Sequence, residues 1–157
     1  MLATSIRTWW QKRNLEPAEL LLNTYPIVRG QTLELRFVRR LKNGSRLPSA
    51  GMIRWRLTCT EVTKTQKGTD STFGHQTLWS ADFPAVHLSA GTTTLEARAS
   101  VDIPANLPAT LAPREAKTHG LLGLQSGSTS SWIEWRLQAA PSVSGFNDEA
   151  KFSLRVR

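Results

Sequence analysis

The sequence predicts an all-β protein, an antiparallel β-sandwich of about seven to eight strands. Two observations favour this fold class. Apolar and polar residues alternate with period two in several short segments, and clusters of Gly, Pro, Asn and Ser separate these segments. No segment carries an apolar stripe of helical period over three turns, which argues against a βαβ fold. With 157 residues, 39% of them hydrophobic and 20% charged, the chain has the composition of one globular domain.

The strands follow from the alternation. At residues 53–59 the odd-numbered positions are Ile, Trp, Leu and Cys, whereas the even-numbered positions are Arg and Thr. Such a strand has one buried and one solvated face, as in antiparallel sheets. Pro104 ends another strand because it lacks a backbone donor. The other clear strands are residues 31–38, 93–103, 132–139 and 152–156, and weaker candidates are residues 20–24 and 76–81. We expect the core to contain Leu35, Phe37, Ile53, Trp55, Leu57, Leu95, Val101, Ile133, Trp135, Leu137, Phe152 and Leu154.

Two connections between these strands are long. Residues 61–74 are polar and rich in Gly, Thr and Lys, which predicts a solvated loop. Residues 104–130 form a longer loop that contains a small apolar knot at Leu121, Leu122 and Leu124. Connections of this length are usually functional or disordered. The sequence leaves three interpretations open for it: disorder, a docking role and a short packed turn.

The net charge of +8 lies entirely in the first part of the chain. Residues 1–60 hold 11 Lys and Arg against 3 acidic residues, whereas residues 61–157 hold 9 against 9. This asymmetry indicates either a polyanionic partner, nucleic acid or an anionic membrane, or a plain solvated face. We expect the basic residues between 39 and 46 to lie in a hairpin loop with Asn43 and Gly44 at its tip. The full candidate basic patch consists of Arg36, Arg39, Arg40, Lys42, Arg46, Arg54 and Arg56.

Residues 1–14 are set apart from the sandwich domain at 15–157. Trp9 and Trp10 are followed by Lys12 and Arg13. Tryptophan at the headgroup level followed by basic residues is typical of the cytoplasmic end of a membrane-spanning helix. These four residues are therefore predicted to be membrane-proximal, in a short helical or extended juxtamembrane segment. The alternative is that the two indoles pack on the sandwich as a cap.

The sequence predicts no catalytic, cofactor or metal site. His75, His87 and His119 are far apart and lack the spacing of metal ligands. No nucleophile elbow, phosphate-binding loop or dinucleotide fingerprint is present in the sequence. Cys59 shares the inward face with Trp55, which predicts a small buried side chain rather than a nucleophile. We therefore expect the protein not to be an enzyme.

Two motifs carry a resemblance to a known family. The turn Ile-Pro-Ala-Asn-Leu-Pro-Ala-Thr ends at Thr110, and the strand Trp-Ile-Glu-Trp-Arg-Leu begins at Trp132. Together they resemble arrestin-like and immunoglobulin-like β-sandwiches, in particular the soluble C-terminal domain of bacterial two-helix membrane proteins of unknown function. The segments 52–59 and 78–79 fit the same layout, so the resemblance spans most of residues 15–157. The chain departs from the pattern between Leu111 and Ser131, where it carries an insertion.

The resemblance implies a non-catalytic protein-interaction module that presents an edge strand or the long loop to an unidentified protein partner. It also implies a cytosolic domain at the inner face of the membrane, within a longer membrane protein. Docking on an anionic lipid surface is the second interpretation. A third is a nucleic-acid-binding β-domain that uses the basic N-terminal half and stacks a base on an exposed Trp132. The oligomeric state stays open.

Overall fold

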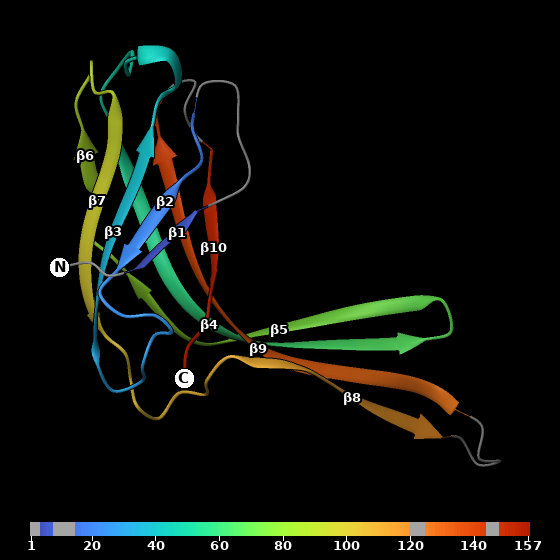
Figure 1. The fold of residues 1–157 in the computed structure, drawn as a ribbon. Coiled ribbons are helices and arrows are strands. Elements are labelled where there is room, and N and C mark those ends of the chain that lie inside the picture. Colours follow the sequence, from blue (N-terminus) through green and yellow to red (C-terminus); the bar gives the residue numbers. More distant parts are fainter. Residues whose placement is uncertain (1–3, 8–14, 120–124, 144–147) are drawn as a thin grey trace.

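The computed structural model describes residues 4–7, 15–119, 125–143 and 148–157. Two antiparallel sheets pack face to face as a sandwich (Figure 1). The four-stranded sheet has the order β1-β2-β3-β7, with β1 at Thr4–Arg7, β2 at Glu19–Leu22, β3 at Thr32–Arg40 and β7 at Thr94–Asp102. The six-stranded sheet contains β4 at Gly51–Lys67, β5 at Asp70–Asp82, β6 at Val86–Leu88, β8 at Leu111–His119, β9 at Gln125–Ser142 and β10 at Ala150–Leu154. A short 3-10 turn, η1, spans Lys42–Gly44.

The six-stranded sheet is long rather than wide. Its order is β10-β9-β4-β5, while β6 pairs with β4 and β8 pairs with β9. Both β6 and β5 pair with the same edge of β4. β6 pairs with Gly51–Ile53 and β5 pairs with the part of β4 that begins at Arg56. β10 and β8 likewise share one edge of β9. The sheet is therefore four strands wide along most of its length.

The core lies between the two sheets, as the alternation predicts. The inward side chains of β3 meet those of β10, where the Phe37 and Phe152 rings pack edge to face with centroids 6.3 Å apart. Every residue predicted for the core is buried except Val101, which is half-buried and packs against it. The prediction of an antiparallel sandwich is confirmed, although the described residues contain ten strands rather than seven or eight.

The prediction of two long loops was wrong, because most of both segments forms strands. Residues 61–74 belong to a continuous hairpin of β4 and β5, turned at Gly68 with a positive φ of 60°. Within residues 104–130, the segments 111–119 and 125–130 are strands that pair with each other, and Leu121, Leu122 and Leu124 lie outside the described residues. These strands extend hydrogen-bonded ladders that begin in the core, so they need no apolar alternation of their own. Residues 104–110 do form a connection without strand structure.

The N-terminal segment contributes to the sandwich. β1 pairs with β2 in register from Thr4 opposite Leu22 to Arg7 opposite Glu19. Four residues of the segment set apart at 1–14 thus form an edge strand of the four-stranded sheet. Trp9, Trp10, Lys12 and Arg13 lie outside the described residues. Among the residues that are described, no helix is long and apolar enough to span a bilayer.

Candidate functional site

The two longest strands extend past the sandwich and form a separate structure. β4 has 17 residues and β9 has 18, whereas β3 and β7 in the covering sheet have 9 each. The surplus ends of β4 and β9 pair with each other from Glu61 opposite Ile133 to Gln66 opposite Ser128. β5 and β8 flank them and complete a four-stranded ribbon that projects from the sandwich (Figure 1). We call this ribbon the β-arm, made of residues 61–67, 70–77, 111–119 and 125–133.

Irregularities in both outer strands mark the base of the β-arm. On one side the register of β4 with β5 shifts after Cys59, which leaves Leu78 without a partner. On the other side the register of β8 with β9 shifts between Leu111 and Arg114. Both shifts lie close to the rung at which Thr60 pairs with Glu134. Bulges bend a strand and increase its twist, so these two register shifts account for the turn of the β-arm away from the sandwich.

Neither face of the β-arm is covered along β5. Each residue of β5 from Asp70 to Thr77 is exposed, whereas strand β10 in the sandwich alternates strictly between buried and exposed. Phe73 is the one large apolar side chain in this segment and is 55% exposed. The ammonium of Lys64 lies 5.7 Å from the centre of its ring. The segment therefore offers no broad apolar face, and a partner that docks here meets its backbone edge and a few side chains.

The two edges of the β-arm differ in how far they are protected. The edge strand β8 contains Pro113, Arg114, Glu115 and Lys117 in its sequence. Proline and charged residues are the usual means by which proteins prevent an edge from pairing with another chain. By contrast, β5 from Ser71 to Thr77 reads Ser-Thr-Phe-Gly-His-Gln-Thr, without proline, Lys, Arg, Asp or Glu. β5 ends the sheet order on its side, so this segment is an open edge.

Arg39 does not belong to a surface patch. Its side chain is 3% exposed, and it donates from Nε to the Glu16 carbonyl at 3.0 Å and from Nη1 to the Asp148 carbonyl at 3.3 Å. Burial lowers the pKa of Arg39, while the charge of Asp148 acts in the opposite direction. Residues 39 and 40 lie in β3 rather than in a loop, so Arg39 shares the inward face with Phe37. The prediction of a basic loop from Arg39 to Arg46 was wrong in this respect.

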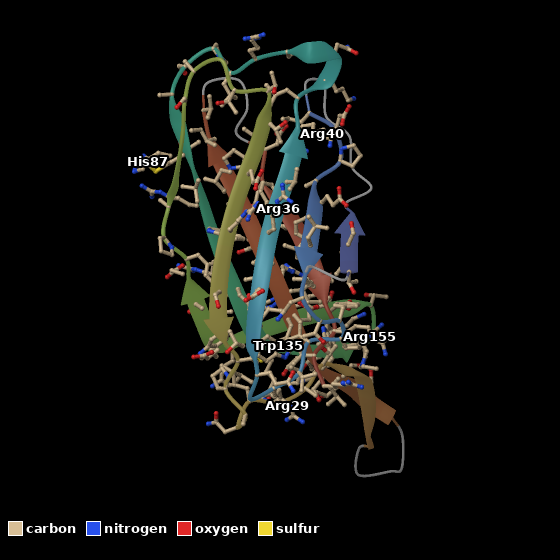
Figure 2. The ribbon with its side chains drawn as sticks, turned by 60° about the vertical axis from the view of Figure 1, so that its left-hand side comes forward. Arg29, Arg36, Arg40, His87, Trp135 and Arg155 are labelled. Carbon is tan, nitrogen blue, oxygen red and sulfur yellow. The ribbon has the colours of Figure 1, made fainter. Side chains whose placement is uncertain are left out.

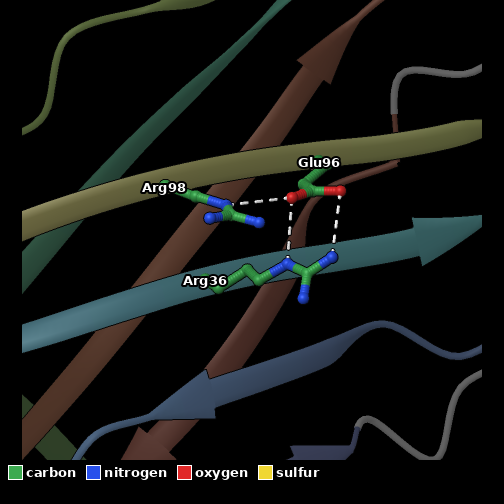
Figure 3. Close-up of polar contacts among 3 residues, drawn as sticks. All are labelled: Arg36, Glu96 and Arg98. Atoms are coloured by element: carbon green, nitrogen blue, oxygen red, sulfur yellow. Dashed lines mark hydrogen bonds and ion pairs between the residues drawn. The ribbon is translucent and has the colours of Figure 1, made fainter. Parts of the chain in front are cut away.

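The remaining basic residues are divided between two opposite faces and one end of the sandwich. Arg36 lies on the outer face of β3 and forms a two-point ion pair with Glu96, at 2.9 and 3.2 Å, and Arg98 donates to the same carboxylate at 3.1 Å (Figure 3). The hydrogen bond from Arg36 is the main cause that lowers the pKa of Glu96; burial acts in the opposite direction, and the hydrogen bond from Arg98 lowers the pKa further. Arg40 lies near the end of the same strand (Figure 2), and Lys42 and Arg46 follow it in the chain.

Arg54 and Arg56 lie on the outer face of the other sheet, because their neighbours Trp55 and Leu57 point into the core. Arg56 pairs with Asp82 at 2.6 Å, and this hydrogen bond raises the pKa of Arg56. Arg54 donates to the Met52 sulfur at 3.4 Å. The residues predicted as one basic patch thus do not converge on one surface.

Other residues singled out by the sequence have structural roles. Cys59 is fully buried, and burial raises its pKa to about 11, so it is a protonated thiol at neutral pH. Trp132 is half-buried, and its indole donates to Glu134 at 2.8 Å. His75 and His87 are exposed. In the part of the chain that the structure describes, no three His, Cys, Asp or Glu side chains gather closely enough to hold a metal ion.

No protein-family model matches the sequence, and no curated protein matches it. Among solved structures, the chain is similar to Spo0M, a sporulation control protein of Bacillus subtilis, with a TM-score of 0.52 and 11% identity over 93% of this chain. This likeness shows the fold. The chain spans 50% of the length of that structure. A second structure is AvmM, which catalyses macrocyclization in alchivemycin A biosynthesis. The alignment covers 91% of this chain and 88% of AvmM, with 12% identity and a TM-score of 0.32. A TM-score this low supports no argument.

Proposed function

We propose that this chain is a non-catalytic protein-interaction module of arrestin-like type, and that its docking element is the open edge of β5 in the β-arm. The observation that carries the proposal is the seven-residue segment Ser71–Thr77, exposed at every position and free of the charges and proline that protect β8. A sporulation control protein with the same fold supports a regulatory rather than catalytic role by analogy.

An extended segment of a partner can add to β5 as a further strand. Every second residue of an edge strand directs its backbone N–H and C=O groups outward, and the partner's main chain satisfies them. Side chains on the two faces of the ribbon then select the partner. On one face these include Phe73 with Lys64 beside it, and on the other face they are small and polar, such as Thr72. The backbone hydrogen bonds provide most of the affinity, and the side chains on the two faces provide the selectivity.

Photo-crosslinking in the native cell tests this proposal. We expect the full-length gene product with p-benzoylphenylalanine at position 73 to form a defined crosslinked product. The combined change Thr72→Lys and Gln76→Lys, which gives β5 the protection that β8 has, should abolish it. The control carries the same photo-reactive residue at Ala85, an exposed position in the connection between β5 and β6, and should give no such product. Equal crosslinking with and without the two lysines would contradict docking at this edge.

We further propose that Trp9, Trp10, Lys12 and Arg13, which follow β1 in the sequence, hold the module at the inner face of a membrane, as part of a longer membrane protein. Basic residues near an anionic surface contribute up to about 1 kcal/mol each, and interfacial indoles add apolar burial. We expect the protein to bind vesicles containing phosphatidylglycerol, and the double change Trp9→Ala and Trp10→Ala to weaken this binding. Sedimentation with vesicles of increasing anionic content measures the effect.

Salt alone does not separate a membrane from nucleic acid, because both interactions weaken as ionic strength rises. The control is therefore single-stranded DNA, whose binding by the same double variant is measured in parallel. Unchanged vesicle binding by that variant, together with DNA binding that falls on Trp132→Ala, would overturn the membrane proposal and favour the nucleic-acid alternative.

A further inference from the structure

We infer that the open edge of β5 pairs with the same edge of a second copy of this chain, antiparallel and with Gly74 on the twofold axis. This inference rests on the proposed function, in which β5 is the docking edge, and it names the partner as the chain itself. It begins from the fact that the strand is exposed on both faces and along one edge from Asp70 to Thr77.

Symmetry limits how two β5 strands can pair. In a twofold antiparallel pair, one residue lies opposite its own copy, so each allowed register is defined by a central residue. Two registers pair seven of the exposed residues. One is centred on Gly74 and pairs Ser71–Thr77, and the other is centred on Phe73 and pairs Asp70–Gln76. A register centred on any other residue would bring the bulge at Leu78 into the ladder or would pair fewer of the exposed residues.

The chemistry of the strand favours the register centred on Gly74. It places Phe73 opposite His75 of the second copy on both sides of the axis, so that two pairs of aromatic rings form on one face. Cross-strand aromatic pairs of this kind stabilise antiparallel sheets. On the other face it places Thr72 opposite Gln76 of the second copy, and no charged residue lies opposite a like charge. The register centred on Phe73 forms one aromatic pair, Phe73 with its own copy, in place of two, and it brings Asp70 into the ladder.

Gly74 itself is not required by the fold of a single copy. Its φ lies outside the positive range, and the nearest atom to a Cβ built there is the Thr63 carbonyl oxygen at 4.0 Å. A glycine inside a strand weakens it and often marks a place where another backbone approaches closely. Pairing of two copies at this residue provides such an approach.

The pairing also explains why the two edges of the β-arm differ. Two antiparallel β5 strands would join the arms into one sheet of order β8-β9-β4-β5-β5-β4-β9-β8, with the sandwiches at opposite ends. The outer edges of this sheet are then the two β8 strands, whose sequence carries proline and charged residues of the kind that disfavour further addition. The assembly therefore closes as a dimer.

Sedimentation equilibrium on the full chain tests the inference. We expect a monomer–dimer equilibrium for the wild type. Thr72→Lys with Gln76→Lys sets lysine opposite lysine at two symmetric positions and should weaken the dimer by about tenfold or more. The matched control is Thr72→Lys with Gln76→Glu, which sets opposite charges at the same positions and should keep the dimer at low salt. Circular dichroism confirms that both variants fold, since both positions are exposed.

Single cysteines distinguish the two registers. Directly opposed residues in an antiparallel pair have Cα atoms about 4.5–5.5 Å apart, a separation that a disulfide can bridge. Gly74→Cys should therefore form a disulfide-linked dimer under mild oxidation faster than Phe73→Cys, and Cys59 stays unreactive because it is buried. A wild type that stays monomeric at all concentrations, or a double-lysine variant that dimerises equally well, would overturn the inference. If the wild type is monomeric while crosslinking at position 73 captures a different protein, the proposed function stands and self-pairing fails.

Discussion

Replacing Trp135 with alanine is expected to lower the free energy of unfolding by about 3–5 kcal/mol. The Trp135 side chain is among the largest that are fully buried, with 1% exposure. Its ring lies 5.8 Å from that of Trp79 on β5, and its indole N–H donates to the Pro108 carbonyl at 3.0 Å. The substitution would open a cavity between the sheet and the loop at residues 104–110 and leave the Pro108 carbonyl without its indole donor.

Urea unfolding followed by far-UV circular dichroism measures this loss, and Trp132→Ala is the matched control. Trp132 lies on the opposite face of the same strand, is half-buried and donates to the Glu134 side chain rather than to a backbone carbonyl. We expect the control to cost about 1–2 kcal/mol, as a partly solvated ring leaves a smaller cavity. A loss of less than about 1 kcal/mol for Trp135→Ala would show that the ring contributes little to the core.

The sandwich could be predicted because its strands are covered on one side only. Where one face packs on a core and the other is solvated, burial imposes period two on the sequence, as at Ile53, Trp55 and Leu57. The same logic extends to Arg39, which is in phase with Leu35 and Phe37 and is indeed buried. Because arginine is charged, the sequence analysis assigned Arg39 to the surface although it is in phase with the buried residues. A buried guanidinium becomes predictable only when the carbonyls that satisfy it are known.

The β-arm could not be predicted in this way, because neither face of β5 is buried there. Without a covering layer, burial imposes no alternation, and most of the β-arm, at residues 61–74 and 111–130, reads as polar loops. A weaker signal was present: the turn Lys67-Gly68-Thr69-Asp70 is flanked by Thr-rich segments, a composition that favours a hairpin. The bulges at its base depend on the register between strands distant in sequence, so no local pattern encodes them.

Gly51 is expected to tolerate no side chain, in contrast to Gly74. It begins β4, next to the rung at which Met52 pairs with Ser142. A Cβ on Gly51 would lie well inside contact distance of the Val143 side chain and of the Ser142 carbonyl oxygen. The Val143 methyl could turn away, but the Ser142 backbone is held by the ladder between β4 and β9. The added methyl group would therefore push β4 and β9 apart near the rung of Met52 with Ser142.

We expect Gly51→Ala to cost about 3 kcal/mol, the upper end of the usual range for overpacking, measured as the shift in the urea midpoint at constant slope. Gly74→Ala is the control, since it makes the same chemical change in the neighbouring strand of the same sheet. A Cβ at Gly74 meets only the Thr63 carbonyl oxygen at 4.0 Å, and its φ is not in the positive range. Removing backbone freedom from the unfolded chain should then stabilise the protein slightly or leave it unchanged. The two variants are compared at the lowest protein concentration that gives a signal, so that pairing between copies does not contribute. Similar losses in both would mean that the cost comes from alanine in a strand and not from the close approach of Ser142.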